Sequence, residues 1–345
     1  MKPIFGLVLT IICFCSSCTK KTEPKEPWQY LDLAPIGAFD EESHGIFLTE
    51  AKIAVDMSEV YVALSHQGLL LKTDSLLNPL SLIDGRDSFP DFEFPAHLML
   101  KDSNLFVEDL ASQRLFVLRK DNFKLKDVIK FPIPSMGIGM DIAEDNSLVF
   151  SSFPEPEKTG LVKWDYTANR TITSKSFFPH EGKLRLSDQI RLGCFCANGD
   201  FWSLGRFLPV LERLDNYGVA KIQYDLSAFQ PIKQAYDTLI TKRQQIPDFE
   251  NSRIAQNIVT SLDCFEDKLL VGFTDLVGLD RSNIRHLLLI SADDTDIRLE
   301  KILRLRTGND DEMYHFQTVT YNPKTSLLYA QGSESNKIYV FRVKL

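Results

Sequence analysis

Six times along this chain, a cluster of turn-forming residues is followed by two short apolar segments. Asn, Asp, Gly and Ser suit tight turns because they tolerate left-handed backbone angles or bond to their own backbone. The strands that follow the turns begin at intervals of 43 to 68 residues. The turn clusters are Asp56–Ser58, Lys101–Asn104, Glu144–Ser147, Ala197–Asp200, Glu266–Lys268 and Asn322–Ser326.

Each turn is flanked by strand-like segments on both sides. In the second unit, Leu98–Leu100 precedes the turn, Leu105–Phe106 and Leu115–Leu118 follow it, and Val128–Phe131 ends the unit. Four short strands at a period of about 40 to 50 residues are typical of propeller blades. A β-sandwich is the alternative, but a sandwich does not require six equivalent units. The pattern predicts an all-β fold, a six-bladed β-propeller over residues 28–345.

The two ends of this region predict how the ring closes. The sixth unit has room for only three strands, the last of them at Ile338–Val343. The apolar segment Gln29–Leu33 precedes the first unit, and we expect it to supply the missing outer strand of the last blade. Closure would remove an open strand edge, which otherwise invites aggregation. The alternative is an unstructured lead-in.

The amino terminus has the pattern of a secretory signal peptide over residues 1–17. Its apolar run of about a dozen residues is too short to span a bilayer. Residues Phe14–Cys18 resemble the lipobox of bacterial lipoproteins, which implies lipid attachment at Cys18. More than one acyl chain would give durable membrane attachment, and plain secretion is the alternative. Residues 18–27, rich in Lys, Glu and Pro, are expected to form a flexible tether.

Charge and cysteine content narrow the possible functions. The formal net charge is −8 and no long basic stretch occurs, so nucleic-acid binding is not expected. Cys194, Cys196 and Cys264 follow the lipobox, and buried free thiols are the favoured prediction. A disulfide between Cys196 and Cys264 in an oxidising compartment is the alternative. No CxxC pair or His cluster accompanies them, so neither a metal nor a cofactor is expected.

The whole chain resembles Bacteroidota lipoproteins that carry six-bladed, TolB-like or NHL-like propellers. The second unit carries the likeness best, in Phe94–Leu100, Asn104–Asp109 and Gln113–Leu118. The resemblance implies attachment to the cell envelope and a propeller shape, and it implies no particular reaction. The basic pair Lys20–Lys21 lacks the acidic run that resembles surface-export signals in these bacteria. We therefore expect the protein at the outer membrane, on its periplasmic side.

In a propeller, the connections that enter the innermost strands surround the axial funnel, which is the usual ligand site. Their mixture of acids, bases, amides and an aromatic suits a polar ligand such as a glycan or peptide. His97 and His315 take corresponding places in two blades, where structural hydrogen bonds are favoured over metal binding. The candidate ligand-binding residues are Asp91, Glu93, His97, Arg191, Arg253, Asn257, Tyr314, His315 and Gln317, and Lys52 and Met136 lie on equivalent connections.

Two long connections are predicted between second and third strands, at Gly205–Gly218 and Thr274–Arg285. Long loops with apolar residues often carry binding function. We expect them to raise one side of the rim and to contact a partner, with local packing on the propeller body as the alternative. The candidate rim residues are Phe207, Leu208, Tyr217, Leu276 and Leu279.

These observations favour binding of an envelope protein, a glycan or a peptide over catalysis. Neither a GxSxG nor an HExxH motif occurs, nor a glycine-rich phosphate loop. The alternative is a hydrolase or lyase that acts on a polar polymer in the funnel. Converging carboxylates in the funnel would favour that alternative.

Overall fold

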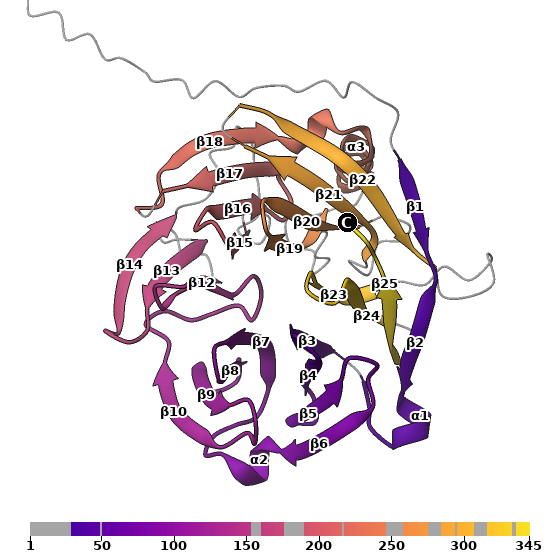
Figure 1. The fold of residues 1–345 in the computed structure, drawn as a ribbon. Coiled ribbons are helices and arrows are strands. Elements are labelled where there is room, and N and C mark those ends of the chain that lie inside the picture. The colour runs from indigo at the N-terminus through magenta and orange to yellow at the C-terminus, as the bar shows by residue number, and fades with distance from the viewer. Residues whose placement is uncertain are drawn as a thin grey trace, which may run out of the picture.

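The computed structural model describes residues 29–48, 50–152, 160–175, 190–215, 217–245, 258–274, 284–293, 295–306, 316–332 and 336–345. Its strands form six antiparallel blades around a common axis, which confirms the predicted six-bladed propeller (Figure 1). The innermost strands of neighbouring blades contact one another in a closed ring. The predicted signal peptide, tether and Cys18 lie outside the described residues.

The strands of each blade run from the axis outward. Blade one contains β3 (Ala51–Asp56), β4 (Glu59–Leu64), β5 (Leu69–Asp74) and β6 (Pro79–Asp84). Blade two contains β7 (Pro95–Lys101), β8 (Asn104–Asp109), β9 (Arg114–Arg119) and β10 (Leu125–Lys130). Blade three contains β11 (Asp141–Ile142), β12 (Ser147–Ser151), β13 (Leu161–Asp165) and β14 (Arg170–Lys175).

The second half of the ring begins with blade four, which contains β15 (Arg191–Phe195), β16 (Phe201–Gly205), β17 (Val210–Leu214) and β18 (Ala220–Asp225). Blade five contains β19 (Val259–Phe265), β20 (Lys268–Thr274), β21 (Ile284–Ala292) and β22 (Ile297–Leu305). Blade six contains β23 (Phe316–Asn322), β24 (Leu327–Gly332) and β25 (Lys337–Arg342), and β2 (Pro35–Asp40) completes it.

All six predicted turn clusters join the first and second strands of a blade. Several of their residues adopt left-handed backbone angles, among them Asn146 with φ 65° and Gly199 with φ 85°. Asn and Gly populate this region at little cost, which is why the turns are readable from the sequence. The turn prediction is therefore confirmed at each blade.

The ring closes with two amino-terminal strands instead of one. The predicted closing segment, observed as β1 (Tyr30–Leu33), does not complete blade six and pairs in parallel with β22 at the outer edge of blade five. The next segment, β2, pairs antiparallel with β25 and is the outer strand of blade six. The first and last parts of the propeller are thus held together across two blades, which join in one nine-stranded sheet.

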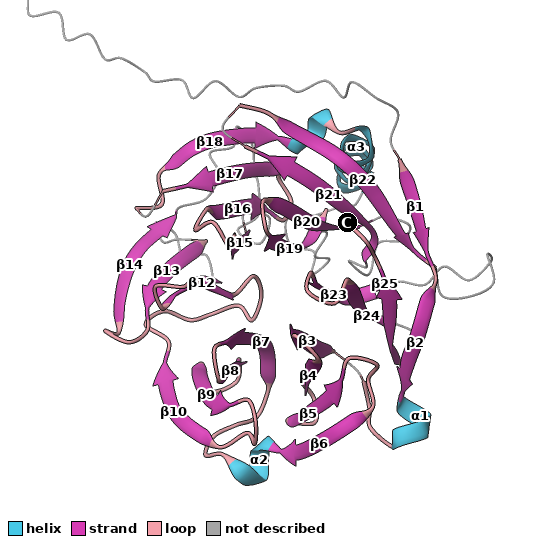
Figure 2. Ribbon diagram, viewed as in Figure 1, coloured by secondary structure: helices cyan, strands magenta, loops and turns pink. Residues whose placement is uncertain are grey.

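Blade four differs from the prediction in its strand assignment. Its third strand is β17, which lies inside the segment expected to be a long loop. The third strand was expected to follow this loop, but the residues there belong to the fourth strand, β18. The insertion comes after the blade, where η2 (Leu226–Ala228) and the helix α3 (Gln230–Gln245) follow. The short helices α1 (Glu41–His44) and α2 (Gly85–Ser88) lie at the periphery with α3 (Figure 2).

The hydrophobic core lies between the blades. In the part of the chain that the structure describes, each interface between adjacent blades has its own cluster of buried side chains. The largest joins blades four and five, where Ile232 and Leu239 of α3 are fully buried. A cluster at every interface follows from side chains that alternate between the two faces of each sheet. No helix within the described ranges is long and apolar enough to span a membrane.

Hydrogen bonds from buried tyrosines repeat between blades. The hydroxyl of Tyr61 in β4 has two acceptors, the Glu59 carboxylate at 2.6 Å and the carbonyl of Lys120 in blade two at 3.1 Å. The hydroxyl of Tyr329, at the same place in β24, donates to the carbonyl of Ser75 in blade one at 2.9 Å. The two bonds between blades reach the turn between the third and fourth strands of the following blade. They fix the angle between blades, since a buried hydroxyl must find an acceptor.

Candidate functional site: the axial channel

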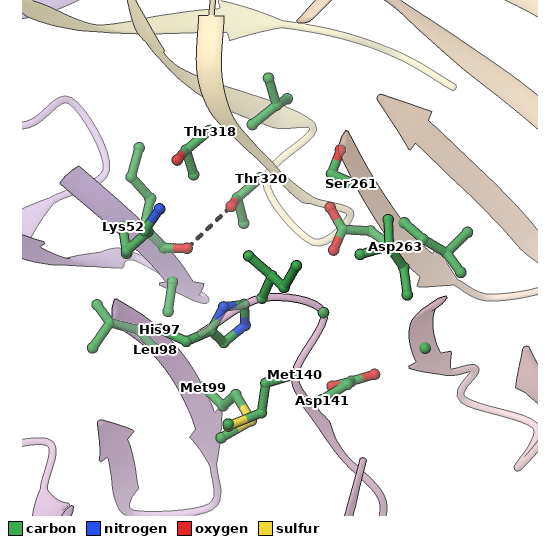
Figure 3. A pocket seen from close by; sticks show the side chains of 18 of the residues that line it. Lys52, His97, Leu98, Met99, Met140, Asp141, Ser261, Asp263, Thr318 and Thr320 are labelled. Atoms are coloured by element: carbon green, nitrogen blue, oxygen red, sulfur yellow. Dashed lines mark hydrogen bonds between the residues drawn. The ribbon is translucent and has the colours of Figure 1, made fainter. Parts of the chain in front are cut away.

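The innermost strands enclose a cavity of about 450 Å³ on the propeller axis. Every blade contributes residues to its wall, through β3, β7, β11, β15, β19 and β23 or the connections beside them (Figure 3). This volume lies within the usual range for small-molecule sites. We call the face at which the chain enters these strands the entrance face.

Side chains of blade six donate hydrogen bonds to backbone carbonyls of blade one that have no partner in their own sheet. Thr318 and Thr320 donate to the carbonyls of Ala51 and Ile53, each at 3.0 Å. Figure 3 shows the second of these bonds beside Lys52. An innermost strand is an edge strand, so its free carbonyls need partners. The threonine hydroxyls of blade six therefore join it to blade one, the first and last blades of the ring.

The entrance face of the channel carries two cations, Lys52 and Arg206. Lys52 is the second residue of β3, and Arg206 directly follows β16. Both side chains are half-buried and line the cavity. Neither has a hydrogen bond to its charged group or a salt-bridge partner among the residues that the structure describes. The Nε atom of Arg206 is inaccessible to water and has no acceptor there.

The pKa values of both cations reflect this setting. Burial lowers the pKa of Lys52, and the charges of Glu50 and Glu108 offset part of that effect. Burial lowers the pKa of Arg206 to about 10. A shielded charge without a partner costs free energy, because it has lost water and gained little in return. Arg206, with a pKa of about 10, stays charged at neutral pH and can bind an anion.

His97 lines the same cavity from β7. Burial lowers its pKa to about 4, and the nearby charge of Lys52 acts in the same direction. Its ring also bonds to the backbone of Met140 in blade three. The imidazole is therefore neutral at physiological pH and joins two blades. Glu108, its cross-strand neighbour, is fully buried, and burial raises the pKa of this carboxyl to about 7.

Two aspartates line the deeper part of the channel. Asp141 in β11 accepts hydrogen bonds from the backbone N–H of Phe195 and of Ile142, each at 2.7 Å. Burial raises the pKa of Asp141 to about 6 in spite of these bonds. Burial raises the pKa of Asp263 in β19 to about 7, and the charge of Asp141 adds to the effect. The two carboxyl groups are close enough to oppose each other's ionisation.

A glycine-containing loop narrows the channel at blade three. Residues Met136–Met140 precede β11 and contribute Gly137, Ile138, Gly139 and Met140 to the cavity wall. Gly137 and Gly139 have φ values of 69° and 61°. A Cβ on Gly139 would lie 2.9 Å from Ser151 Oγ and 3.1 Å from Leu192 Cα, so the loop passes close to blade four. Glycine is needed at this position for both reasons.

Apart from Arg191, the predicted funnel residues fall into three groups. His97 and Gln317 line the cavity. Asp91 and Glu93 are exposed outside the cavity wall, and the Asp91 carboxylate pairs with Arg114. Arg253, Asn257, Tyr314 and His315 lie outside the described residues.

Arg191 does not face the funnel. Its side chain is 1% exposed, and its Nη1 atom lies 2.5 Å from Glu212 Oε2 in β17 of the same blade. The side chain of a strand residue points to one face of its sheet. Here that face is covered by another blade, so Arg191 is a buried structural cation. The sequence position alone does not distinguish this orientation from one toward the axis.

The rim prediction is corrected at two positions. Phe207 and Leu208 are 0% and 7% exposed and belong to the cluster between blades four and five. Because β17 begins at Val210, these residues form a short buried connection and cannot contact a partner. Tyr217 is 79% exposed in the turn before β18. Leu276 and Leu279 lie outside the described residues.

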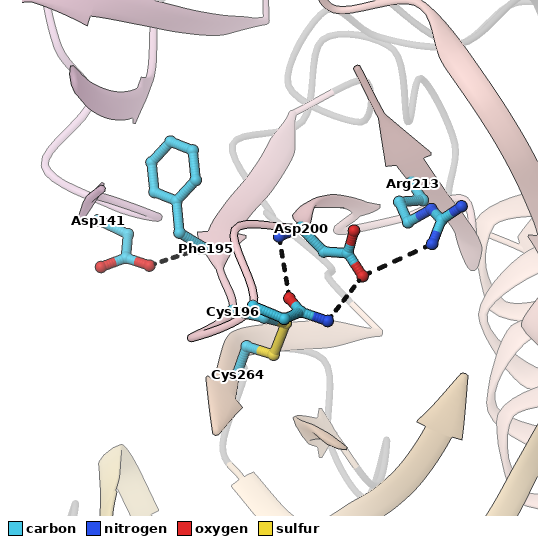
Figure 4. Close-up of a disulfide and its surroundings, with 7 residues drawn as sticks. Asp141, Phe195, Cys196, Asp200, Arg213 and Cys264 are labelled. Carbon is cyan, nitrogen blue, oxygen red and sulfur yellow. Dashed lines mark hydrogen bonds and ion pairs between the residues drawn. A yellow bond between two sulfur atoms is a disulfide. The ribbon is translucent and has the colours of Figure 1, made fainter. Parts of the chain in front are cut away.

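The favoured prediction of free thiols is wrong for two of the three cysteines. Cys196 and Cys264 form a disulfide between blades four and five, with Cα atoms 5.0 Å apart (Figure 4). Cys196 directly follows β15 and Cys264 lies near the end of β19, and these neighbouring innermost strands bring the two residues together near the deep end of the channel. Cys194 is a buried free thiol. A second hollow of about 430 Å³, at the turn face of the ring, shares Asp263 and Cys264 with the channel.

The sequence interpretation missed Arg206, Asp141 and Asp263. One sequence pattern could have identified such channel residues: a lone charged residue within or next to a short apolar strand, as in Thr260–Phe265. Arg206 was hidden because blade four was divided into strands wrongly. Asp141 was hidden because β11 has only two residues.

Comparison with known proteins supports the fold alone. No protein-family model and no curated protein sequence matches the chain. A Bacteroides fragilis protein assigned as exported is similar in structure, with a TM-score of 0.56 and 10% identity over 92% of this chain and 100% of that chain. The WD40 domain of Neurospora crassa Pan2 has a TM-score of 0.53 and 8% identity over 92% and 98% of the two chains.

A third similar structure is the β-propeller domain of Cps50 (Swd1) from Myceliophthora thermophila. It has a TM-score of 0.52 and 11% identity over 85% of this chain and 83% of that chain. The fold and the channel together define the chain as a six-bladed β-propeller with a polar axial cavity.

Proposed function

We propose that this protein is an exported binding protein whose axial channel holds the acidic group of a small ligand, such as the end of a glycan or peptide. The observation that carries the proposal is the pair Lys52 and Arg206, two half-buried cations in one cavity that have no hydrogen-bond or salt-bridge partner for their charged groups among the described residues. Binding in the funnel agrees with the function expected from the sequence, and the acidic group is the more specific part.

Solvation favours the binding of an anion by these two cations. Lys52 and Arg206 have already lost much of their water on folding, as their lowered pKa values indicate. A ligand anion therefore gains charge-assisted hydrogen bonds without a further large desolvation of the protein. Gln317 and Thr318 line the same cavity and offer further polar groups.

Two observations support export. The Cys196–Cys264 disulfide is typical of oxidising compartments outside the cytosol. The similar Bacteroides fragilis protein is assigned as exported. Lipid attachment at Cys18, on the periplasmic side of the outer membrane, is the form of export that the amino-terminal pattern favours.

A second candidate function is hydrolysis of a polar polymer. The pair Asp141 and Asp263 favours it, because two carboxyl groups in one cavity, both with pKa values raised by burial, can serve as acid and base. Release of product from acidic oligosaccharides or peptides by the wild-type protein, lost in Asp263→Asn, would establish this function.

Calorimetric titration with matched acid and neutral ligands tests the binding proposal. The ligands are galacturonic acid against galactose, and short peptides against their carboxyl-terminal amides. We expect the acids to bind at least about ten-fold more tightly than their neutral counterparts. The double variant Lys52→Met with Arg206→Met should lose this preference.

The control is Lys324→Met, which removes a lysine from the second hollow at the opposite face. This control should retain the preference for acids. The double variant should be at least as stable as the wild type, because it removes two shielded charges. Equal binding of acids and neutral counterparts, or a double variant that keeps the preference, would overturn the proposal.

A further inference from the structure

The carboxyl group of Asp263 can accept hydrogen bonds but has no donor beside it among the described residues. Its carboxylate has no hydrogen bond and no ion pair within the described ranges, although it lines the cavity deep in the channel. Asp141, in contrast, is fixed by the N–H groups of Phe195 and Ile142. Figure 3 shows both carboxyl groups on the cavity wall. At the deep end, the carboxylate of Asp141 is held by hydrogen bonds, and that of Asp263 has none among the described residues. Both line the same cavity.

The charges of the channel are separated along its axis. Lys52 lies near the start of β3 and Arg206 lies in the connection after β16, so both are at the entrance face. Asp263 is near the end of β19 and borders the second hollow at the opposite face. A ligand in this cavity would meet cations at one end and carboxylates at the other.

The deep end suits an ammonium group better than a metal ion. Within the part of the chain that the structure describes, no group of three or more His, Cys, Asp or Glu residues is arranged to hold a metal. An ammonium has three donors and needs few acceptors. Asp263, Asp141 and the hydroxyl of Ser261 all line the cavity and supply such acceptors.

We infer that the channel binds a zwitterionic ligand, a short peptide, with its amino group on Asp263 and Asp141 and its carboxylate on Lys52 and Arg206. This inference rests on the proposed function and adds a class of ligand to it. A ligand with an acidic group alone would leave Asp263 and Asp141 beside each other without a positively charged partner. The cations of the entrance face therefore do not account for the deep end of the site. A zwitterion neutralises both ends of one cavity at once.

Capped peptides test the inference. Equimolar libraries of all dipeptides and tripeptides are bound to the immobilised protein in three forms: free, acetylated at the amino end, and amidated at the carboxyl end. Retained peptides are identified by mass spectrometry and measured by calorimetry. We expect acetylation to weaken binding by about ten-fold or more, because it removes a charged donor from two carboxylates.

Two variants assign the effect to the deep end. Asp263→Asn should reduce the effect of acetylation to less than about three-fold, and it should bind the acetylated form at least as well as the wild type does. Asp267→Asn, in the exposed turn between β19 and β20, should behave as the wild type. Thermal unfolding of each variant shows that the fold is intact.

The outcomes separate this inference from the proposed function. If acetylated and free peptides bind equally, or if no peptide is retained while galacturonic acid still binds, the zwitterion is overturned and the binding of acids stands. If amidated and free peptides bind equally, the inference fails, and the proposed function fails with it when galacturonic acid also binds no more tightly than galactose. If acetylation weakens binding equally in Asp263→Asn and in the wild type, the amino group binds elsewhere and the inference fails.

Discussion

Asp32 accepts two hydrogen bonds from Arg304, at 2.7 Å and 3.0 Å, although 272 positions separate the two residues in the chain. The guanidinium group of Arg304 also lies 4.5 Å from the ring centre of Tyr30. These contacts hold β1 against β22 at the outer edge of blade five. The next strand, β2, then completes blade six. Closure therefore depends on two short strands that act on different blades.

Residues of β2 that face the core should control the stability of the whole ring. Phe39 is 1% exposed, whereas Ile36 in the same strand is 48% exposed. We expect Phe39→Ala to reduce the free energy of unfolding by about 3 to 5 kcal/mol. Ile36→Ala is the matched control and should change it by less than about 1 kcal/mol. Urea denaturation measures both, and equal effects would show that β2 is not an integral strand.

The disulfide should stabilise the interface between blades four and five. Cys196 and Cys264 are 68 positions apart, so the covalent loop is long. Chain-entropy arguments predict a loss of about 4 kcal/mol when such a crosslink is removed. We expect Cys196→Ala with Cys264→Ala to show this loss in chemical denaturation under oxidising conditions. Added reductant should destabilise the wild type but leave this double variant unchanged, and a wild type insensitive to full reduction would contradict the prediction.

The deep carboxylates should make stability depend on pH. Burial raises the pKa of Asp263 from 3.8 to about 7. Between these values the folded state retains a proton that the unfolded state has lost, so the free energy of unfolding falls as pH rises. The penalty is absent below about pH 4 and complete above about pH 7.

Asp263→Asn removes this penalty and should therefore be more stable than the wild type at pH 8. The gain is on the order of 1 to 3 kcal/mol, and it should shrink to near zero at pH 4. His97, whose lowered pKa gives the opposite slope, is common to both proteins and cancels in the comparison. Denaturation at several pH values measures the difference. A constant difference between pH 4 and pH 8 would mean that Asp263 titrates normally.

The ion pair of Arg191 and Glu212 should behave as a structural element and not as part of the site. Both side chains are buried, at 1% and 6% exposure. Arg191→Met leaves the buried charge of Glu212 without this partner and should cost about 3 to 5 kcal/mol of stability. Combining it with Glu212→Leu should restore much of that loss. Ligand affinity, measured on the folded fraction, should not change in the double variant.

The fold was readable from the sequence because its signals are local. Turn residues such as Asn146 and Gly199 occupy left-handed positions that few other residues accept. Apolar segments on both sides of each turn supply the buried faces between blades. An amino-terminal strand completes the last blade, as predicted. The strand that pairs with β25 is Pro35–Asp40, however, and not the more apolar segment before it. Pairing partners are set by tertiary packing, which local patterns do not contain.

The site was less predictable, because it depends on which way single side chains point. His97 and Gln317 were placed in the cavity correctly, and Lys52 was recognised on an entering connection. Arg191 points into an interface between blades, and Phe207 packs in the core. A shift of one residue along a strand reverses the face of every side chain. The wrong division of blade four therefore also concealed Arg206.

The most direct test of the channel is the set of small molecules that the protein retains. Mature wild-type protein is incubated with envelope extract, washed and denatured, and the released molecules are identified by mass spectrometry. We predict at least one compound with an acidic group, retained by the wild type and by Lys324→Met but lost from the double variant Lys52→Met with Arg206→Met. Identical profiles from all three proteins would contradict the assignment of the axial channel as a binding site for acids.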